Sequence, residues 1–174
     1  MNYIVGIDLG GTNIVCGCVA EDGSAMHGVR SVATGAEEGP DAVVHRIIAA
    51  ARESIAATRA AVPDMKLIGA GVGAPGPLDT RSGLVLLTPN LGWVNMPLRQ
   101  RLQDGLGLRT ALDNDANCAV LGEWWRGAAR GTRNTVGLTI GTGIGGGIII
   151  DGRLFHGTSD IAGEIGHMTI DANG

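Results

Sequence analysis

The sequence predicts an α/β protein with a partly parallel sheet, in which one supersecondary unit begins twice. Apolar strands alternate with helical segments along the chain, which is the pattern of such a sheet. In addition, an apolar strand runs into a Gly/Thr turn both at residues 5–12 ("VGIDLGGT") and at residues 136–143 ("VGLTIGTG"). Each copy continues into a second apolar strand and an acidic-glycine turn, at Asp22-Gly23 and at Asp151-Gly152.

The amino-acid composition limits the classes of protein to which this chain can belong. Apolar residues make up 44% and charged residues 17%, so the chain is globular, with 30 glycines for turns and close backbone approaches. A net charge of −4 and 3% aromatic residues argue against nucleic-acid binding. The start "MNYIVGIDLGG" is unlike a signal peptide, and no apolar run is long enough for a membrane span. Three cysteines without framework spacing favour a reducing, cytoplasmic location, where Cys16, Cys18 and Cys118 act as small buried hydrophobes.

In the first part of the chain, three strands precede a helix. The segments "YIVGIDL", "IVCGCVAEDG" and "AMHGVRSVAT" are rich in β-branched residues and are separated by turn signals. From Pro40 to about Ala61 the apolar residues follow helical spacing, which predicts a long amphipathic helix. "KLIGAGVGA" then has the short apolar character of a buried central strand.

The middle of the chain predicts a loop, two further helices and a strand. "PGPLDTRSGLVLLTPNLGW" is expected to be a loop, and "PLRQRLQDGLG" a helix closed by Gly105 or Gly107. "RTALDND" is the next expected strand, and "ANCAVLGEWWRGAARG" a helix that ends at Gly131. The repeated strands of "NTVGLTIGTGIGGGIIIDG" follow.

The glycine-rich loops suit phosphate better than a dinucleotide. Both "GTGIGG" and "GVGAPG" match G-x-G-x-x-G, but one runs into a strand and the other into prolines, whereas the dinucleotide motif must open a helix. A Walker loop needs a lysine, and the only one, Lys66, precedes a strand. Backbone N–H groups of a Gly/Thr turn can bind an anion, with Thr12 or Thr142 adding a hydroxyl, and Asp8 suits Mg²⁺ beside it. Each loop alone is equally consistent with a simple hairpin.

Asn114 and Asp115 stand where a strand gives way to a helix, the position at which open α/β sheets place ligand groups. Asp115 has two interpretations. It is either a helix N-cap or a general base that accepts a hydroxyl proton during phosphoryl transfer.

Six segments in order, "GIDLGGTN", "GAPGPLD", "TPNLGW", "DNDANCAVLGE", "GLTIGTGIGGGIIIDG" and "AGEIGHM", resemble the ROK family of bacterial sugar kinases and sugar-responsive repressors. The resemblance extends over nearly the whole chain and is strongest to the glucokinases of that family. It implies the actin-like ATPase fold, with two ribonuclease-H-like lobes. Residues 1–131 would form the first lobe with its sugar-binding loops, and residues 132–174 an incomplete second lobe.

The resemblance also implies roles for individual residues. The phosphate of ATP would be bound by two loops, with Asp8 near Mg²⁺: Asp8, Gly10, Gly11, Thr12 and Asn13 in the first, and Gly141, Thr142 and Gly143 in the second. Asp115 would be the catalytic base toward the 6-OH of a hexose. The sugar would further contact Gly76, Asn90, Asn114, Glu164 and His167.

The ROK motif of zinc-binding cysteines is the main departure from the family pattern. His167 would bind a structural Zn²⁺ in the longer protein, but the cysteine ligands expected after it do not occur in this sequence. Without the resemblance, Glu164 and His167 would more often be surface residues than a site. We therefore expect the chain as given to be an inactive fragment of a homodimeric kinase.

The leading hypothesis is ATP-dependent phosphorylation of glucose to glucose 6-phosphate. Other hexoses (mannose, fructose, N-acetylated hexosamines) and inorganic polyphosphate as donor are also consistent with these motifs. A sugar-sensing ROK repressor is the alternative of another class, although its DNA-binding domain would precede "GIDLGGTN".

Overall fold

The computed structural model describes residues 1–141 and 143–172. The chain forms two compact units, Met1–Asn114 and Asp115–Gly174. The sequence placed the division after residue 131, so the structure differs in grouping the third helix with the second unit. No helix among the described residues is long and apolar enough to cross a membrane.

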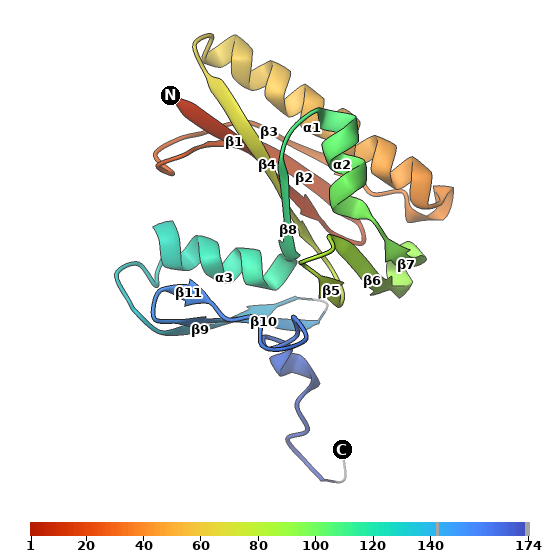
Figure 1. The fold of residues 1–174 in the computed structure, drawn as a ribbon, viewed down its shortest axis with the longest axis vertical. Coiled ribbons are helices and arrows are strands. Elements are labelled where there is room, and N and C mark those ends of the chain that lie inside the picture. Colours follow the sequence, from red (N-terminus) through yellow and green to blue (C-terminus); the bar gives the residue numbers. More distant parts are fainter. Residues whose placement is uncertain (142, 173–174) are drawn as a thin grey trace. The chain divides into compact units, whose positions relative to one another are not determined.

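The first unit is built on a five-stranded mixed sheet with the order β3-β2-β1-β4-β8. Its strands are β1 (Asn2–Leu9), β2 (Asn13–Ala20), β3 (Met26–Ala33), β4 (Lys66–Ala74) and β8 (Thr110–Asn114). The β1 strand pairs antiparallel with β2 and parallel with β4, and β4 pairs parallel with β8. The carboxyl ends of β1, β4 and β8 therefore share one edge of the sheet (Figure 1).

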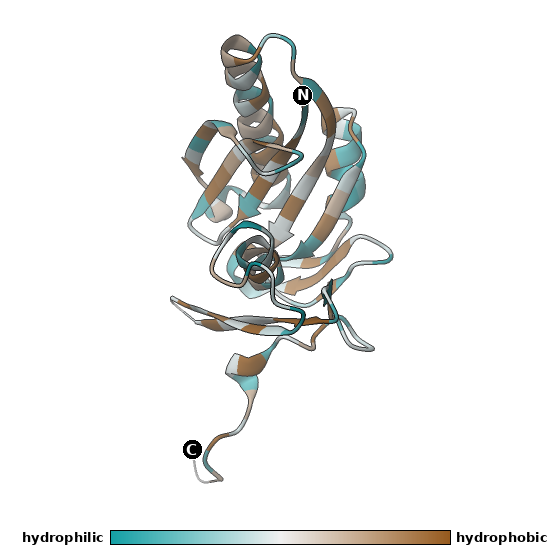
Figure 2. Ribbon diagram, turned by 90° about the vertical axis from the view of Figure 1, so that its left-hand side faces the viewer, coloured by the Kyte–Doolittle hydropathy of each residue, from teal (hydrophilic) through white to brown (hydrophobic). Residues whose placement is uncertain are grey.

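Two helices, α1 (Pro40–Ala61) and α2 (Leu98–Leu106), cover one face of this sheet (Figure 1). Alternate residues of β1 point into the core beneath α1, which contributes its apolar stripe. On the opposite face of β1, Ile4 and Asp8 are exposed. Figure 2 shows hydrophobic (brown) stretches along the strands of this sheet, interrupted by paler and hydrophilic (teal) ones. The predicted bounds of α1 and β4 are confirmed, and α2 ends before Gly107, which adopts a φ of 67°.

The prediction of a loop at residues 75–93 was wrong. Three short strands form a second sheet in this region: β5 (Leu78–Asp79), β6 (Leu84–Thr88) and β7 (Trp93–Met96). Val85 pairs with Met96, and Val85 and Trp93 are buried in the core. The prolines and glycines that suggested a loop occupy the connections, because strands this short leave little apolar pattern to detect.

The second unit combines one helix with a three-stranded antiparallel sheet of order β11-β10-β9. Its elements are α3 (Asp115–Arg126), β9 (Thr135–Ile140), β10 (Ile144–Ile150) and β11 (Arg153–Leu154). The helix packs on the sheet where Val120 lies against Gly137 and Gly147, at which a larger residue would overlap the valine. This packing places α3 in the second unit.

The helix α3 ends at Arg126, so the predicted end at Gly131 was wrong. The Glu123 carboxylate accepts a hydrogen bond from the Ala128 amide at 2.8 Å, and its carbonyl accepts one from Gly127 at 2.9 Å. Glu123 thereby closes the helix in a turn before the glycine at 131 is reached.

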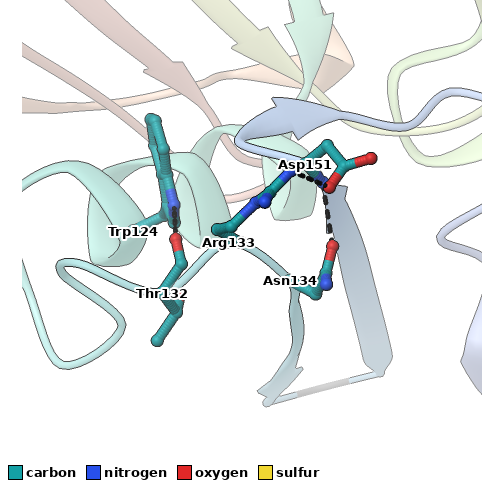
Figure 3. Close-up of polar contacts among 5 residues, drawn as sticks. All are labelled: Trp124, Thr132, Arg133, Asn134 and Asp151. Carbon is teal, nitrogen blue, oxygen red and sulfur yellow. Dashed lines mark hydrogen bonds and ion pairs between the residues drawn. The ribbon is translucent and has the colours of Figure 1, made fainter.

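Polar contacts stabilise the end of this sheet at which β10 turns into β11 (Figure 3). Asp151 and Gly152 have φ angles of 51° and 74° and form the predicted two-residue turn between β10 and β11. Arg133 pairs with the Asp151 carboxylate at 2.7 Å, and the Asp151 amide donates to Asn134 at 2.8 Å (Figure 3). The Trp124 indole donates to the Thr132 carbonyl at 2.8 Å, which ties α3 to the segment before β9.

Gly28 sets the distance between β3 and α1, and its replacement by Ala should be costly. Its φ is 63°, and an added Cβ would overlap the Ser54 carbonyl oxygen and the Thr58 hydroxyl. We expect Gly28→Ala to lower the free energy of unfolding by about 2–4 kcal/mol, from the left-handed backbone and the overpacking together. Urea denaturation measures this, with Gly71→Ala in the same sheet as control because a Cβ there meets nothing within 4 Å. Equal stability of the two variants would contradict the packing described.

Candidate functional site

The first glycine loop connects β1 to β2 as a tight turn. The Gly10 amide donates to the Asn13 carbonyl at 2.9 Å, and a Cβ on Gly10 would lie 2.9 Å from that same oxygen. Asp8, Gly11, Thr12 and Asn13 are all exposed. The loop therefore presents open backbone and the Asp8 carboxylate at the carboxyl end of β1.

Three predicted sugar-binding residues of the first unit lie near this loop. A Cβ on Gly11 would be 3.7 Å from the Asn90 Cβ, so the phosphate loop and the Asn90 turn are neighbours. Gly76 has a φ of 87° and packs against the Leu87 carbonyl and the Thr88 side chain, just before that turn. Asn114 pairs with Ala74 at the end of β8. The first unit thus gathers Asp8, the glycine loop, Gly76, Asn90 and Asn114 at one edge of its sheet.

Asp113 is a further carboxylate at this edge that the sequence reasoning did not single out. Asp8 pairs with Gly73 across β1 and β4, and Gly73 pairs with Asp113 across β4 and β8. Residues paired in register point to the same face, so the two carboxylates flank a glycine. The Asp113 carboxylate also accepts the Asn114 amide at 2.8 Å. Its place directly before Asn114 in "LDND" was the available signal.

The second unit brings Asp115 together with the second glycine loop. A pocket of ≈ 340 Å³ is lined by Asp115, Ala116, Thr139, Ile140, Gly141, Gly143, Ile144 and Gly145. The Gly141 amide donates to the Gly143 carbonyl at 2.9 Å, and a side chain at either glycine would meet open space. Thr142, the third residue predicted for this loop, lies outside the described residues.

Asp115 is the first residue of α3 and is half-buried. Its Oδ1 accepts a hydrogen bond from the Ala116 amide at 2.8 Å, so the carboxylate interacts with the amino end of the helix. This contact suits the N-cap interpretation, while the position on the pocket wall suits the general-base interpretation. The two roles are compatible, because a carboxylate has two oxygens.

Glu164 and His167 lie on a short segment that packs on β10. His167 ends a 3₁₀ turn, Ile165–His167, and its Nε2 is 3.8 Å from Glu164 Oε2. The backbone of Gly163 contacts Gly146, and that of Gly166 contacts the carbonyl of Ile144, a residue of the pocket wall. The side chain of His167 is 84% exposed and that of Glu164 is 37% exposed. Both are therefore accessible to a ligand.

The described residues differ in how well they fit the two expected metal ions. Mg²⁺ needs only one or two carboxylates when phosphate completes its shell, so the exposed Asp8 beside the glycine loop fits it. A structural Zn²⁺ needs four ligands. Within residues 1–141 and 143–172, no three His, Cys, Asp or Glu residues gather to hold a metal, so His167 does not make a zinc site with them.

Two acidic groups near these segments have shifted pKa values. Burial, followed by the neighbouring Cys18 and Asp8, raises the pKa of the Cys16 thiol to about 12. Cys16 and Cys18 are fully buried core residues, as predicted, whereas Cys118 is only half-buried. Asp79, in the "GAPGPLD" segment, has its pKa lowered by hydrogen bonds from the Ser82 side chain and backbone and from the Arg81 amide.

The sheet order β3-β2-β1-β4-β8, with helices on its face and a second strand-turn-strand unit in β9 and β10, defines an actin-like ATPase fold. The family model of the ROK family matches residues 4–174. The chain belongs to the ROK family.

Several known proteins are similar to this chain. Glucokinases from Thermotoga maritima and Halalkalibacterium halodurans are 40% and 36% identical over 98% and 99% of it. A crystal structure of a ROK family glucokinase from Streptomyces griseus in complex with glucose and AMPPNP superposes with a TM-score of 0.84 at 34% identity, over 99% of this chain and 52% of that one. A putative xylose repressor from Caldicellulosiruptor sp. is 36% identical over 99% of the chain and 43% of its own length. The chain spans about half the length of the glucokinases, 52% and 51% respectively.

Proposed function

We propose that this chain contributes to an ATP-dependent hexose kinase, with glucose as its substrate. The observation that carries the proposal is the pocket in which Asp115 lies beside Gly141 and Gly143. A phosphoryl transfer to a sugar needs a base for the hydroxyl proton next to a binding site for phosphate, and a carboxylate beside an open glycine turn supports both roles. The glucokinase relatives and the glucose and AMPPNP complex of the Streptomyces griseus protein support the same chemistry.

Each group would act in the transfer as follows. Asp115 would accept the proton of the sugar 6-OH as that oxygen attacks the γ-phosphorus of ATP, while the bond from the γ-phosphorus to the β,γ-bridging oxygen breaks and ADP leaves. The exposed backbone of each glycine loop would donate hydrogen bonds to phosphate oxygens. Asp8 would hold Mg²⁺, which would supply positive charge to offset that of the phosphates. The sugar is oriented by Gly76, Asn90 and Asn114 in the first unit, and by Glu164 and His167 in the second.

A repressor that senses a sugar is the second candidate, because the xylose repressor relative matches 99% of the chain. Such a protein would bind the sugar with the same residues and would have no need for the base. Turnover therefore separates the two candidates more clearly than sugar binding does.

The test is an ADP-release assay on the product of the uninterrupted reading frame that contains residues 1–174. ATP and Mg²⁺ are supplied with glucose, mannose, fructose or an N-acetylated hexosamine in turn, and polyphosphate replaces ATP in a separate arm. We expect the highest kcat/KM with glucose and ATP. Sugar binding measured by calorimetry without phosphorylation of any sugar would support the repressor. A higher kcat/KM with another hexose would overturn glucose as the substrate but not the kinase function.

A further inference from the structure

Thr34 makes two hydrogen bonds to the first glycine loop from a position outside every predicted motif. Thr34 directly follows β3 and is fully buried. Its hydroxyl donates to the Gly10 carbonyl at 2.7 Å, and its backbone amide donates to the Thr12 carbonyl at 2.8 Å. One buried residue thus fixes two carbonyl groups of a turn whose own internal bond is Gly10 to Asn13.

The orientation of the loop follows from these bonds. A trans peptide is planar, with its C=O and N–H pointing in opposite directions. When Thr34 holds the Gly10 carbonyl, the Gly11 amide must point away from Thr34. No hydrogen bond among the described residues engages the amides of Gly11 or Thr12, both of which are exposed. The threonine therefore turns a donor outward, as an anion site requires.

Arg46 supports Thr34 from α1. Its Nη1 donates to the Thr34 carbonyl at 2.5 Å, and its Nη2 pairs with Glu38 at 2.7 Å. Gly35 makes room for the guanidinium: its φ is 63°, and any Cβ there would overlap Nη1. The arginine side chain is 28% exposed. A continuous set of contacts thus runs from Glu38 through Arg46 and Thr34 to the loop.

We propose that Thr34, supported by Arg46, is a positioning residue for the first phosphate loop and sets the affinity for the nucleotide rather than for the hexose. This inference rests on the proposed kinase function for its effect on affinity. Its effect on the loop itself is independent of that function. Thr34 is fully buried, so it would act on a nucleotide through Gly10 and Thr12 rather than by direct contact.

The matched variants are Thr34→Val, Thr34→Ser and Thr58→Val, each made in the product of the uninterrupted reading frame that contains residues 1–174. Valine keeps the shape and the backbone amide of Thr34 but loses the hydroxyl donor, and serine restores the donor. Thr58 is equally buried, and its hydroxyl bonds the Ser54 carbonyl at 2.8 Å within α1, so Thr58→Val removes a comparable hydrogen bond away from the loop. Hydrogen exchange by mass spectrometry, on peptides covering residues 8–14 and 30–36, reports the order of the loop in each variant.

We expect faster exchange at both peptides in Thr34→Val, and an increase of about tenfold in KM for ATP with little change in KM for the hexose. Thr34→Ser should restore both quantities, and Thr58→Val should change neither. Exchange in Thr34→Val equal to that of the wild type would overturn the inference, as would equal increases in both KM values. If no variant turns over but Thr34→Val still loosens the loop, the positioning role stands and the kinase function fails.

Discussion

Asp115→Asn is expected to lower kcat by about 10²–10⁴-fold while the KM values for ATP and hexose change little. Asparagine has nearly the same shape, and its Oδ1 can still accept the hydrogen bond that the Ala116 amide donates at 2.8 Å. The amide does not accept the proton of the attacking hydroxyl, so only the chemical step should suffer. Steady-state kinetics on the product of the uninterrupted reading frame that contains residues 1–174, with separate titrations of ATP and glucose, would measure the effect.

Asp104→Asn is the control for this change. Asp104 is an exposed residue of α2 whose carboxylate accepts a hydrogen bond from Gln100 at 2.8 Å. Its variant should turn over like the wild type. If Asp115→Asn also retained the turnover of the wild type, Asp115 would be left with the helix-capping role alone.

Gly163→Ala is the substitution we expect to impair hexose binding most without removing any ligand group. A Cβ on Gly163 would overlap the Gly146 carbonyl oxygen and lie 3.2 Å from the Gly147 Cα, both of which are backbone atoms of β10. The segment that carries Glu164 would have to move away from the strand. We expect a loss of about 1–3 kcal/mol in the free energy of unfolding and a KM for glucose raised at least about tenfold.

The control for Gly163→Ala is another Gly→Ala change in the same unit. Gly122 lies within α3, and a Cβ there meets nothing within 4 Å. Because alanine favours a helix by about 1 kcal/mol over glycine, Gly122→Ala should raise stability and leave both KM values unchanged. Thermal unfolding and the same kinetic titrations test the pair. An unaltered KM for glucose in Gly163→Ala would place Glu164 outside the sugar site.

The sequence correctly predicted the helices and strands whose apolar pattern extends over enough consecutive residues to be recognised without knowledge of the fold. The helix α1 has its apolar stripe and begins at Pro40, so its bounds matched. The Asp-Gly pair predicted the turn at residues 151 and 152, where both residues have positive φ angles. The sheet of β5 to β7 was missed because the pairing of Val85 with Met96 joins short segments across a turn. The end of α3 was missed because it depends on one side chain, Glu123, rather than on glycine.

The candidate site shows a similar division. The sequence motifs identified Asp8, Asp115 and the loop glycines as site residues, because carboxylates and glycine-rich turns can be recognised from the sequence alone. Thr34 was not detectable in this way, since it is an ordinary residue at the end of a strand until the fold places it against the loop. Asp113 is adjacent to Asn114 in the sequence, but its position across Gly73 from Asp8 follows only from the register of three strands. Supporting residues of this kind become evident only when distant segments are seen side by side.

The sheet topology also has a consequence for the order of folding. In the second unit, β9, β10 and β11 are consecutive hairpins joined by short turns, so their contacts are local and form early. In the first unit, β1 pairs in parallel with β4 across two strands and α1, and β4 pairs with β8 across a further sheet and α2. Each of these pairings closes a long loop, so conformational entropy is lost before the stabilising strand contacts form. Their formation is therefore slow. Because β4 takes part in both of these long-range pairings, we expect its pairing with β1 and β8 to limit the folding of the first unit.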